Sequence, residues 1–460
     1  MLTLRFQSGT LLVENDAPNT APLPTAVSAL CQYDKRVDAW RAPACHYAPI
    51  LLTLHRGGIP FRDLAREYVP LENIPPFPRE PRFYQREALE AWRKKQRRGL
   101  VVLPTGTGKS FLAQMAIADA ARSTLVVVPT LDLVAQWALQ LQAAFGRTVG
   151  VWGGGSHETA AITVSTYDSA LLCMPHQGNH FGLLVVDECH HLPGPAYSQI
   201  ARECLAPYRL GLTATPERDD ALDSEYAALL GEICYRKEIT DLPQETVLAP
   251  YETQTIPTPL DDEEREHYQQ ARGIYIGFLH EKGINLGSRQ GWGNFLRACS
   301  REPNGRQALR AYWEQRRISR SPQSKFRMVA KLLEAHRHDR TLVFTADNDT
   351  AYQIGNAFLL PVLTHHTKTA ERMAFLEAFR EGRYPVLVTS KVLNEGVDVP
   401  AANVGIVVSG SGSVREHVQR LGRILRPAEG KTAVLYELVT PDTAETYTSE
   451  RRRMHPAYNG

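Results

Sequence analysis

The sequence has no long apolar run, no strong excess of charge of either sign and no closely paired cysteines. No apolar stretch approaches the ~18 residues that a membrane-spanning helix needs, so we expect no contact with a membrane. A net charge of +2 excludes a protein that binds nucleic acid through overall positive charge, and any such contact must come from a local groove. None of the seven cysteines forms a C-x-x-C pair, which predicts neither a disulfide framework nor a zinc site.

The N-terminal segment also lacks the apolar core of a signal peptide. It carries Glu14 and Asp16 instead, so we expect no secretory leader. Together with the cysteine pattern, this favours a cytoplasmic protein, because the reducing cytoplasm keeps thiols free.

What is present is the composition of an ordinary globular protein, with 43% apolar and 22% charged residues. A chain of 460 residues exceeds the ~100–200 residues of a usual domain, so about two to four domains are expected. Leu2, Leu4 and Phe6 alternate with polar residues, which is the period of a strand. We expect residues 1–68 to form a small α+β domain and the proline-rich residues 69–81 to form a linker.

Two series of short, wholly apolar runs separated by helical segments follow. The first series lies in residues 82–245, as 99–104, 123–129, 161–165, 182–188 and 209–215, and the second lies in residues 325–460, as 341–345, 384–390, 402–409 and 432–439. Buried parallel strands that alternate with helices have this pattern. The sequence therefore predicts two α/β domains with parallel sheets in tandem.

The residues between these domains, 260–324, are charged and helical in pattern. One helical face is shared by Tyr268, Ala271, Tyr275, Phe278 and Leu279. A second helix contains Leu309, Tyr312 and Trp313, and it is surrounded by Arg306, Arg310, Arg316, Arg317 and Arg320. A nucleic-acid contact and a merely solvated helical hairpin explain these arginines about equally well.

The strongest motif is LPTGTGKS, residues 103–110, between an apolar run and a helical segment. Backbone N–H groups of such a turn and the helix N-terminus bind phosphates. Lys109 would contact the β- and γ-phosphates, and Ser110 would offer a hydroxyl ligand to Mg²⁺. Leu103 replaces the consensus glycine, so a plain strand-to-helix turn would explain this motif alone. The expected ATP-binding residues of the loop are Pro104, Thr105, Gly106, Thr107, Gly108, Lys109 and Ser110.

Two carboxylates, Asp187 and Glu188, end the apolar run 182–188. Open α/β sheets bind ligands at the carboxyl ends of their strands. We expect Asp187 to bind Mg²⁺ and Glu188 to orient or deprotonate the attacking water. A capping Asp–Glu pair would explain these two residues alone about as well, but the phosphate-binding loop in the same domain favours catalysis.

A third element, QRLGRILR at residues 419–426, lies in the second α/β domain. Arg423 and Arg426 are three residues apart on one helical face, and we assign both, with Gln419, to the catalytic machinery. An arginine that reaches a γ-phosphate across an interdomain cleft raises the rate by ~10³–10⁵. A solvated basic helix face is the alternative, and Gly422, which allows close packing, argues against it.

These elements occur in the order found in superfamily-2 helicases, and the chain resembles the XPB group of DNA repair helicases. The matching segments, in order, are 82–85 (RFYQ, the adenine-reading motif), 104–110 (motif I), 128–130 with 136–137 (Ia), 164–167 (Ib), 187–190 (II), 212–215 (III), 343–345 (IV), 394–398 (V) and 419–426 (VI). The segments 210–220 and 409–427 are typical of the XPB group. The resemblance implies two tandem RecA-like domains, a helical thumb at 260–324 and an N-terminal domain similar to the damage-recognition domain.

The resemblance also implies functional residues beyond the three motifs above. Nucleotide contacts are expected at Arg82, Gln85, Gly396 and Asp398, and contacts to DNA or coupling to hydrolysis at Thr130, Thr166, His190, Thr213, Thr215, Arg218, Asp219, Asp220 and Thr345. The chain departs from the family at residues 218–220, where Arg-Asp-Asp replaces Arg-Glu-Asp. The shorter aspartate would weaken unwinding if this element separates the strands.

The implied function is an ATP- and Mg²⁺-dependent 3′→5′ helicase or duplex translocase that acts on forked or duplex DNA, in excision repair or related processing. A prokaryotic or viral cytoplasm, close to the nucleoid, is the implied setting, and a nuclease is an implied partner protein. The alternatives are another superfamily-2 motor (a restriction-type translocase subunit, a phage branch-remodelling helicase or an RNA helicase) and a non-catalytic scaffold. The intact Lys109, Asp187 and Glu188 argue against the scaffold.

Overall fold

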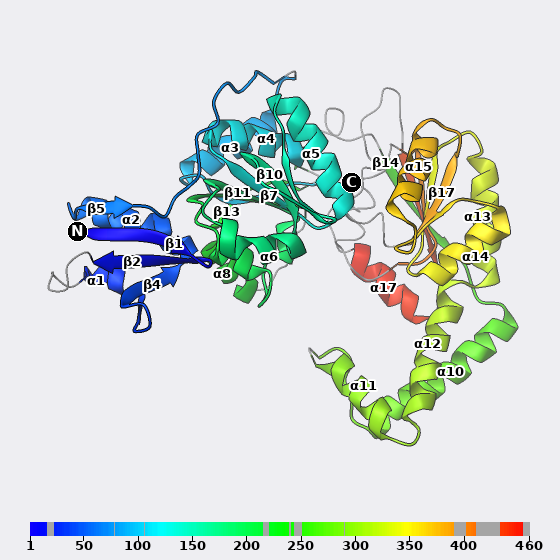
Figure 1. The fold of residues 1–460 in the computed structure, drawn as a ribbon. Coiled ribbons are helices and arrows are strands. Elements are labelled where there is room, and N and C mark those ends of the chain that lie inside the picture. The colour runs from blue at the N-terminus through cyan, green and yellow to red at the C-terminus, as the bar shows by residue number, and fades with distance from the viewer. Residues whose placement is uncertain are drawn as a thin grey trace. The chain divides into compact units, whose positions relative to one another are not determined.

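The computed structural model describes residues 1–15, 23–77, 79–104, 106–214, 220–238, 241–242, 251–288, 290–390, 402–410 and 433–453 (Figure 1). The chain divides into two compact units, the first running to about residue 239 and the second from about residue 240. None of the helices in these ranges combines the length and the apolar character of a membrane span.

The first unit begins with a small α+β domain, as the N-terminal alternation predicts. Its sheet has the order β3-β4-β2-β1-β5, made by Leu2–Gln7 (β1), Thr10–Asn15 (β2), Gln32–Asp34 (β3), Ala39–Pro43 (β4) and Phe61–Asp63 (β5). Ser8 and Gly9 join β1 to β2 with φ values of 48° and 72°, the backbone that suits a two-residue hairpin turn. Helices α1 (Thr25–Ser28) and α2 (Tyr47–Arg56) complete the domain, and Ile50 and Leu54 of α2 lie in its core.

The expected linker is fixed to the following domain over its first residues. The backbone N–H of Val69 donates to the Ser123 hydroxyl over 2.8 Å, and that of Leu71 donates to the Ala121 carbonyl over 2.9 Å. Further along, the Phe77 ring meets the Phe111 ring edge to face, with centroids 5.3 Å apart. This segment therefore packs along the surface of the domain that it introduces.

The first RecA-like domain has an eight-stranded sheet in the order β13-β6-β12-β11-β7-β10-β8-β9. Its strands are Arg98–Val102 (β6), Thr124–Val128 (β7), Gly150–Gly153 (β8), Ser156–Glu158 (β9), Ile162–Thr166 (β10), Leu183–Asp187 (β11), Tyr208–Thr213 (β12) and Ile233–Arg236 (β13). Its helices are Phe83–Lys94 (α3), Lys109–Ala120 (α4), Leu131–Phe145 (α5), Tyr167–Gln177 (α6), Ser198–Arg202 (α7) and Asp220–Leu229 (α8). The five strands expected from the apolar runs are confirmed, and β8 pairs with β9 as an antiparallel edge.

The second unit contains another parallel sheet, in the order β14-β19-β18-β15-β17-β16. The strands are Tyr251–Pro257 (β14), Thr341–Phe344 (β15), Val362–Leu363 (β16), Val386–Thr389 (β17), Val404–Val407 (β18) and Ala433–Val439 (β19). Helices Gln323–Ala335 (α13), Asn348–Phe358 (α14), Thr369–Arg380 (α15) and Ala444–Arg453 (α17) accompany them. The four expected strands are confirmed, but β14 joins this sheet from outside the expected range of 325–460.

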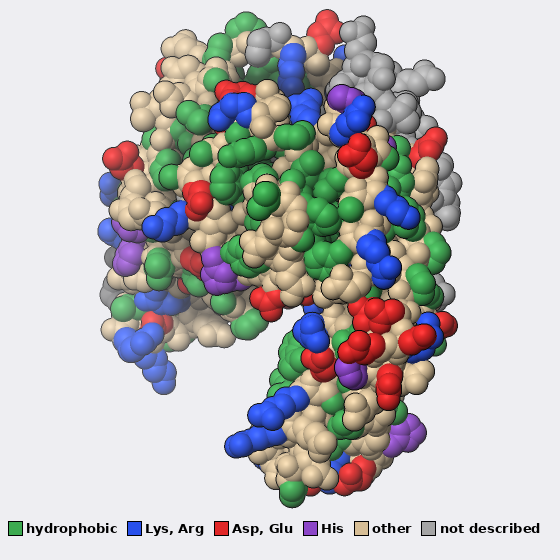
Figure 2. All heavy atoms as spheres, turned by 90° about the vertical axis from the view of Figure 1, so that its right-hand side faces the viewer, with side chains coloured by type: hydrophobic (Ala, Val, Ile, Leu, Met, Phe, Trp, Pro, Cys, Tyr) green, Lys and Arg blue, Asp and Glu red, His purple; other side chains and the backbone are tan. Residues whose placement is uncertain are grey.

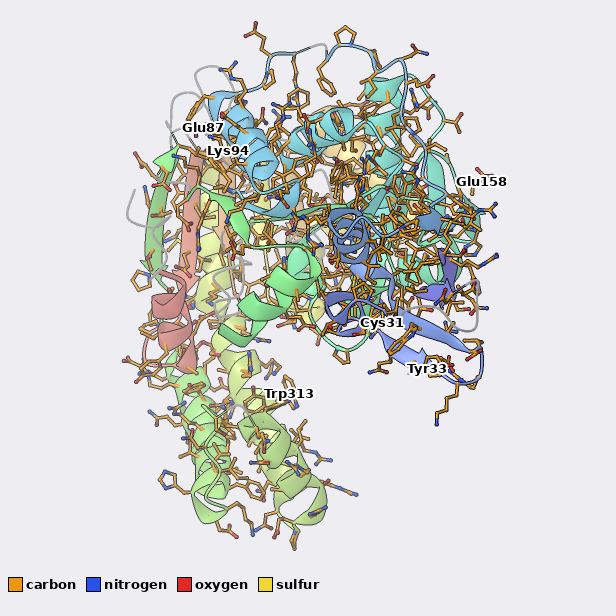
Figure 3. The ribbon with its side chains drawn as sticks, turned by 90° about the vertical axis from the view of Figure 1, so that its left-hand side faces the viewer. Cys31, Tyr33, Glu87, Lys94, Glu158 and Trp313 are labelled. Atoms are coloured by element: carbon orange, nitrogen blue, oxygen red, sulfur yellow. The ribbon has the colours of Figure 1, made fainter. Side chains whose placement is uncertain are left out.

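The thumb lies between β14 and α13 in the chain and contains three helices, Asp262–Glu281 (α10), Gly291–Arg301 (α11) and Gly305–Arg320 (α12). The residues that α10 buries are the five of the expected helical face. The Asp261 carboxylate caps α10 by accepting from the Glu264 backbone N–H over 2.9 Å. Trp313 of α12 is 52% exposed, however, and does not belong to the core of the hairpin (Figure 3).

Candidate nucleotide site

The loop between β6 and α4 has the backbone of a phosphate-binding turn. Gly106 and Gly108 have φ values of 84° and 81°, a region that residues with a side chain rarely adopt. Gly108 caps α4, so the first N–H groups of that helix have no helical acceptor and are available to an anion. The Lys109 ammonium donates to the Leu103 carbonyl over 3.2 Å and so lies over the loop.

The departure from the consensus at Leu103 has a packing explanation. Its side chain is fully buried, and its backbone N–H donates to the Thr213 carbonyl over 3.0 Å. The Thr107 hydroxyl donates to the Pro104 carbonyl over 2.7 Å, which closes the loop internally. The expected contact residue Thr105 lies outside the described residues.

The first turn of α3 holds this loop in place. The Tyr84 hydroxyl and the Gln85 side-chain amide both donate to the Thr107 carbonyl over 2.9 Å. The side-chain Oε1 of Gln85 accepts from the Arg82 backbone N–H over 3.0 Å, which fixes the orientation of the side-chain amide. A side-chain carbon on Gly108 would come within 2.7 Å of the Gln85 nitrogen. Gln85, expected at the nucleotide, therefore also fixes the loop, and the sequence interpretation missed Tyr84.

Asp187 lies at the carboxyl end of β11 and is buried. Its Oδ1 accepts from the Glu188 backbone N–H over 3.0 Å, and its Oδ2 accepts from the Trp137 indole N–H over 3.1 Å. Burial and the Glu188 carboxylate raise the pKa of Asp187 to about 6, while the positive charge of Lys109 acts in the opposite direction. The loop after β6 and the acidic pair at the end of β11 lie at the same edge of the sheet, because both strands pair in parallel with β12.

The oxygen donors at this position suit Mg²⁺. A carboxylate from Asp187 and a hydroxyl from Ser110, in the first turn of α4, are the hard ligands that Mg²⁺ prefers. In the ranges that the structure describes, no three His, Cys, Asp or Glu side chains gather as a metal cage. A metal bound here would complete its shell with phosphate and water oxygens, as Mg²⁺ commonly does.

Glu188 adopts an unusual backbone that its neighbours fix. Its φ of 46° lies in the left-handed region, which costs a non-glycine residue about 1 kcal/mol or more. The Tyr167 hydroxyl donates to the carbonyl groups of Asp187, over 2.9 Å, and Glu188, over 3.1 Å. Tyr167, which the sequence interpretation did not single out, therefore holds the turn that carries both carboxylates.

His190 connects the acidic pair to β12. Its Nδ1 lies 3.4 Å from a Glu188 carboxylate oxygen and 3.2 Å from the Thr213 hydroxyl. Both His190 and Thr213 are buried. Two of the residues expected to couple hydrolysis to strand contact, His190 and Thr213, are therefore in direct contact. His191 instead packs its ring against Tyr167, with centroids 5.9 Å apart.

The threonines expected to contact DNA have capping or internal roles for their hydroxyls. Thr130 caps α5 and Thr166 caps α6, accepting from backbone N–H groups over 3.3 Å and 3.1 Å. Thr345 is fully buried, and its hydroxyl donates to the Asp347 carbonyl over 2.8 Å. In this structure Thr345 can shape the loop after β15, but its side chain does not reach the surface.

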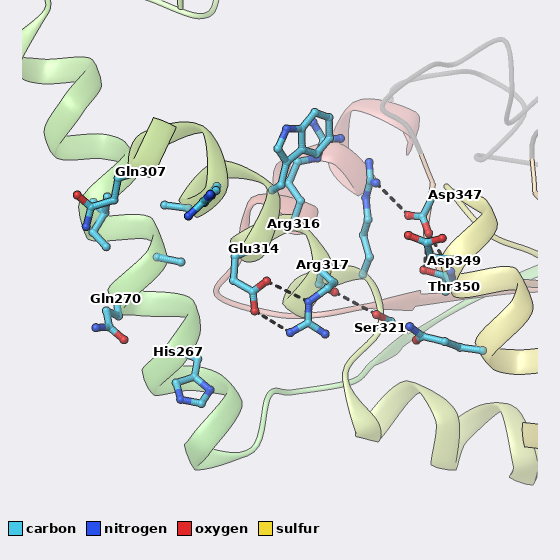
Figure 4. A pocket seen from close by; sticks show the side chains of 17 residues that line it. His267, Gln270, Gln307, Glu314, Arg316, Arg317, Ser321, Asp347, Asp349 and Thr350 are labelled. Carbon is cyan, nitrogen blue, oxygen red and sulfur yellow. Dashed lines mark hydrogen bonds and ion pairs between the residues drawn. The ribbon is translucent and has the colours of Figure 1, made fainter. Parts of the chain in front are cut away.

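Four of the five thumb arginines, Arg310, Arg316, Arg317 and Arg320, line a groove of about 1080 Å³ between α10, α12 and the start of α14 (Figure 4). Arg317 pairs with Glu314 over 2.6 Å, and Arg320 pairs with Asp347 over 3.0 Å. Acidic and basic side chains also lie side by side on the thumb surface in Figure 2. The basic character expected of α12 is therefore partly neutralised within the second unit itself.

Several expected site residues cannot be assigned a geometry. Thr215, Arg218, Asp219, Gly396, Asp398, Gln419, Arg423 and Arg426 lie outside the described residues, and Asp220 begins α8 without a described side chain. The nucleotide contacts of motif V, the Arg-Asp-Asp element and the catalytic role of motif VI stay predictions.

Comparison with known proteins gives three matches to protein families. Residues 4–65 match the Xeroderma pigmentosum group B helicase damage recognition domain, residues 79–218 the type III restriction enzyme res subunit, and residues 309–458 the ERCC3/RAD25/XPB C-terminal helicase. These ranges cover the N-terminal domain, most of the first RecA-like domain and most of the second unit.

Two relatives and two solved structures extend the comparison. The chain is 41% identical over 374 residues to DNA 3'-5' translocase XPB2 of Sulfurisphaera tokodaii, covering 81% of this chain and 84% of the relative. It is 32% identical to DNA 3'-5' helicase XPB of Mycobacterium tuberculosis, covering 77% of this chain but 60% of that relative. The Hef helicase domain of Pyrococcus furiosus (TM-score 0.56, 20% identity, 81% of this chain and 98% of that one) has a similar fold. So does Dbp5 of S. cerevisiae bound to RNA and ADP BeF3 (TM-score 0.53, 16% identity, 82% and 87%).

Proposed function

Because the chain belongs to the XPB family of helicases, we propose that it is an ATP-hydrolysing motor that moves 3′→5′ along DNA. The relatives named above carry this polarity in their names. The observation that carries the proposal is the placement of the Lys109 loop and of Asp187 and Glu188 at one edge of the first RecA-like sheet. A phosphate-binding turn beside an acidic pair provides the groups that nucleotide hydrolysis needs.

The described residues divide the chemical work between them. The α4 N-terminus and Lys109 bind the phosphates, and Glu188 orients the attacking water. Ser110 and Asp187 would hold Mg²⁺, which when bound neutralises phosphate charge. We assign Arg423, Arg426 and Gln419 to the same reaction, by their motif, as residues that complete the site from the second RecA-like domain.

Coupling to movement would begin at Thr213. Its carbonyl accepts from Leu103 at the base of the phosphate-binding loop, and its hydroxyl contacts His190 beside Glu188. A change at the γ-phosphate would therefore reach the end of β12 from two sides. The segment that follows contains Thr215 and the Arg218-Asp219-Asp220 element, which we propose contacts the duplex.

The DNA interface is proposed to read the backbone and not the bases. The N-termini of α5 and α6, capped by Thr130 and Thr166, present N–H groups that bind phosphate without sequence preference. Binding would therefore weaken steeply with salt. The thumb groove, with the exposed ring of Trp313, would add contacts from the second unit.

Two finer assignments rest on the family alone. The match of residues 4–65 to a damage-recognition domain supports a role in DNA repair, in the cytoplasm or nucleoid. A nuclease partner is proposed from the family resemblance. Co-purification of the tagged chain with a nuclease from its own cells tests this partner, and a tagged Lys109→Ala variant serves as its control.

The deciding experiment is an ATPase assay with single-stranded DNA, duplex, fork and RNA, beside a strand-displacement assay on substrates of both polarities. We expect stimulation by DNA but not RNA, and displacement only with a 3′ loading strand. Lys109→Ala should abolish hydrolysis, because Lys109 is the cation that lies over the loop. Equal stimulation by RNA, or full hydrolysis by Lys109→Ala, would contradict the proposal.

A second activity, translocation on duplex without full unwinding, is favoured by one observation. Asp219 replaces the longer glutamate of the family element, which shortens the reach of a strand-separating residue. Displacement of a triplex-forming strand without displacement of the duplex strand would support translocation. Asp219→Glu should then increase duplex unwinding.

A further inference from the structure

Trp137 makes a hydrogen bond that the motif description does not account for. It lies in the middle of α5, is 1% exposed, and donates its indole N–H to Asp187 Oδ2 over 3.1 Å. The other Asp187 oxygen accepts from the Glu188 backbone N–H. Both oxygens of the expected metal ligand therefore have a donor, and the two donors come from different parts of the fold. This arrangement restricts rotation of the carboxylate.

The Trp137 indole N–H donates to a carboxylate, whereas the indoles of two other buried tryptophans in the same unit donate to neutral groups. Trp92 donates to the Arg209 carbonyl over 2.8 Å, and Trp152 donates to the Thr159 hydroxyl over 3.1 Å. A buried indole N–H needs an acceptor, and such a neutral group is sufficient. A bond to a carboxylate is stronger and more directional. Trp137 thus provides orientation at the nucleotide site beyond what packing requires.

Helix α5 also connects this indole to the expected DNA surface. Thr130 caps the helix, and Trp137 follows it by seven residues, which is about 10 Å along the axis. A helix of this length moves nearly as a rigid rod. A displacement of the capped end by a bound phosphate would therefore also displace the donor to Asp187.

We propose that Trp137 is a positioning residue for the metal–nucleotide site, which holds the Asp187 carboxylate in the orientation that Mg²⁺ requires and ties it to α5. The proposal rests on the proposed ATP-driven function. It concerns an outer partner of a metal ligand, a class whose loss weakens metal binding by about 10- to 100-fold. Trp137 does not itself contact the nucleotide in this assignment.

The test compares Trp137→Phe with the matched control Trp92→Phe. Each change removes one buried indole N–H and keeps an aromatic ring. Titration calorimetry of the full chain would measure ADP binding without metal, and then Mg²⁺ binding to the ADP complex. For Trp137→Phe we expect Mg²⁺ affinity to fall by about 10-fold or more while metal-free ADP affinity stays within about twofold. For Trp92→Phe we expect neither to change.

Three results would overturn the inference: unchanged Mg²⁺ affinity in Trp137→Phe, an equal loss in both variants, or a loss of metal-free ADP binding in Trp137→Phe. Should Trp137→Phe not fold, fluorine NMR of the 5-fluorotryptophan-labelled wild-type chain replaces it, with Trp137 assigned by eliminating the other five tryptophans. Mg²⁺ added to the ADP complex should then shift Trp137 more than Trp92, and the absence of a shift refutes the inference. Failure of the wild-type chain to hydrolyse ATP would instead refute the proposed function.

Discussion

Replacement of Arg209 by methionine should destabilise the first RecA-like domain more than any exposed arginine can. Arg209 lies on β12 and is fully buried. Its guanidinium donates to four carbonyl groups, those of Ala206 (3.1 Å), Ala201 (2.9 Å), Leu229 (2.6 Å) and Cys204 (2.8 Å). These carbonyls belong to α7, to the loop after it and to the end of α8. One side chain therefore ties three segments to the strand that carries Thr213.

The size of the effect follows from the acceptors that methionine leaves behind. A buried carbonyl without a donor costs about 1–3 kcal/mol, and methionine fills most of the arginine volume without replacing any donor. Taking the lower end for each of four carbonyls gives about 4 kcal/mol. For a domain of this size that corresponds to a fall in Tm of about 8–16 °C. Lysine keeps the charge but offers a single donor atom, so Arg209→Lys should be intermediate.

Differential scanning calorimetry of the full chain measures this change in the thermal transition of the first unit. The matched control is Arg93→Met, since Arg93 is half exposed and pairs with Asp119 over 2.6 Å. Exposed pairs contribute less than about 1 kcal/mol, so the control should lower Tm by at most about 4 °C. A drop for Arg209→Met no larger than that of the control would show that the four carbonyls find other donors, and the reasoning would be wrong.

Three further predictions concern the site and the second unit. The pKa of Asp187 is raised to about 6, and Mg²⁺ needs the ionised carboxylate. The Mg²⁺ concentration for half-maximal ATPase activity should therefore be constant above pH 6 and rise about tenfold per pH unit below it. An Mg²⁺ requirement that does not change between pH 5 and 8 contradicts this prediction. Tyr167→Phe removes the one hydroxyl donor that the carbonyls of Asp187 and Glu188 share, and it should lower kcat by about tenfold and Tm by about 2–4 °C, as ATPase assays and calorimetry would show. Lys325→Met breaks a buried ion pair with Glu445 at 2.6 Å and should destabilise the second unit by about 3–5 kcal/mol. Lys325→Met with Glu445→Leu should recover only part of that loss, because the Val408 carbonyl and the Thr440 N–H lose their partners. Equal Tm values for the single and double variants would refute the pairing.

The elements that sequence predicts well are those whose pattern is unambiguous. The central strands of both sheets are buried on both faces, so each is a continuous apolar run bounded by turns or helices. The edge strands β9 and β16 have three and two residues, too few for any periodicity. Strand β14 was missed because its sheet partner, β19, lies about 180 residues away in the chain, a pairing that no local pattern indicates. Helix α11 was not singled out within the expected helical segment 260–324, because two glycines in its first turn lower the helix propensity there.

For the site, too, some residues can be predicted from the sequence and others cannot. The glycine turn, Lys109 and Asp187 follow from motifs, since phosphate and metal chemistry restricts the residue types at fixed spacing. The supporting contacts of Tyr84, Trp137 and Tyr167 do not follow, although each lies inside or beside a recognised motif. All three are buried aromatic residues with one polar atom, which by pattern belong to the core. Only the three-dimensional position of their acceptors assigns them to the site.

The order of the strands adds an argument about coupling that motif order alone does not contain. In the chain β12 follows both β6 and β11, but in the sheet it lies between them. Thr213 is paired with Val102 on one side, and Asp187 is paired with Leu212 on the other. The phosphate-binding loop and the acidic pair therefore cannot separate or approach without acting on the end of β12. Arg209 anchors the other end of that strand. A movement of the phosphate-binding loop relative to the acidic pair would therefore displace mainly Thr213 and the residues that follow it.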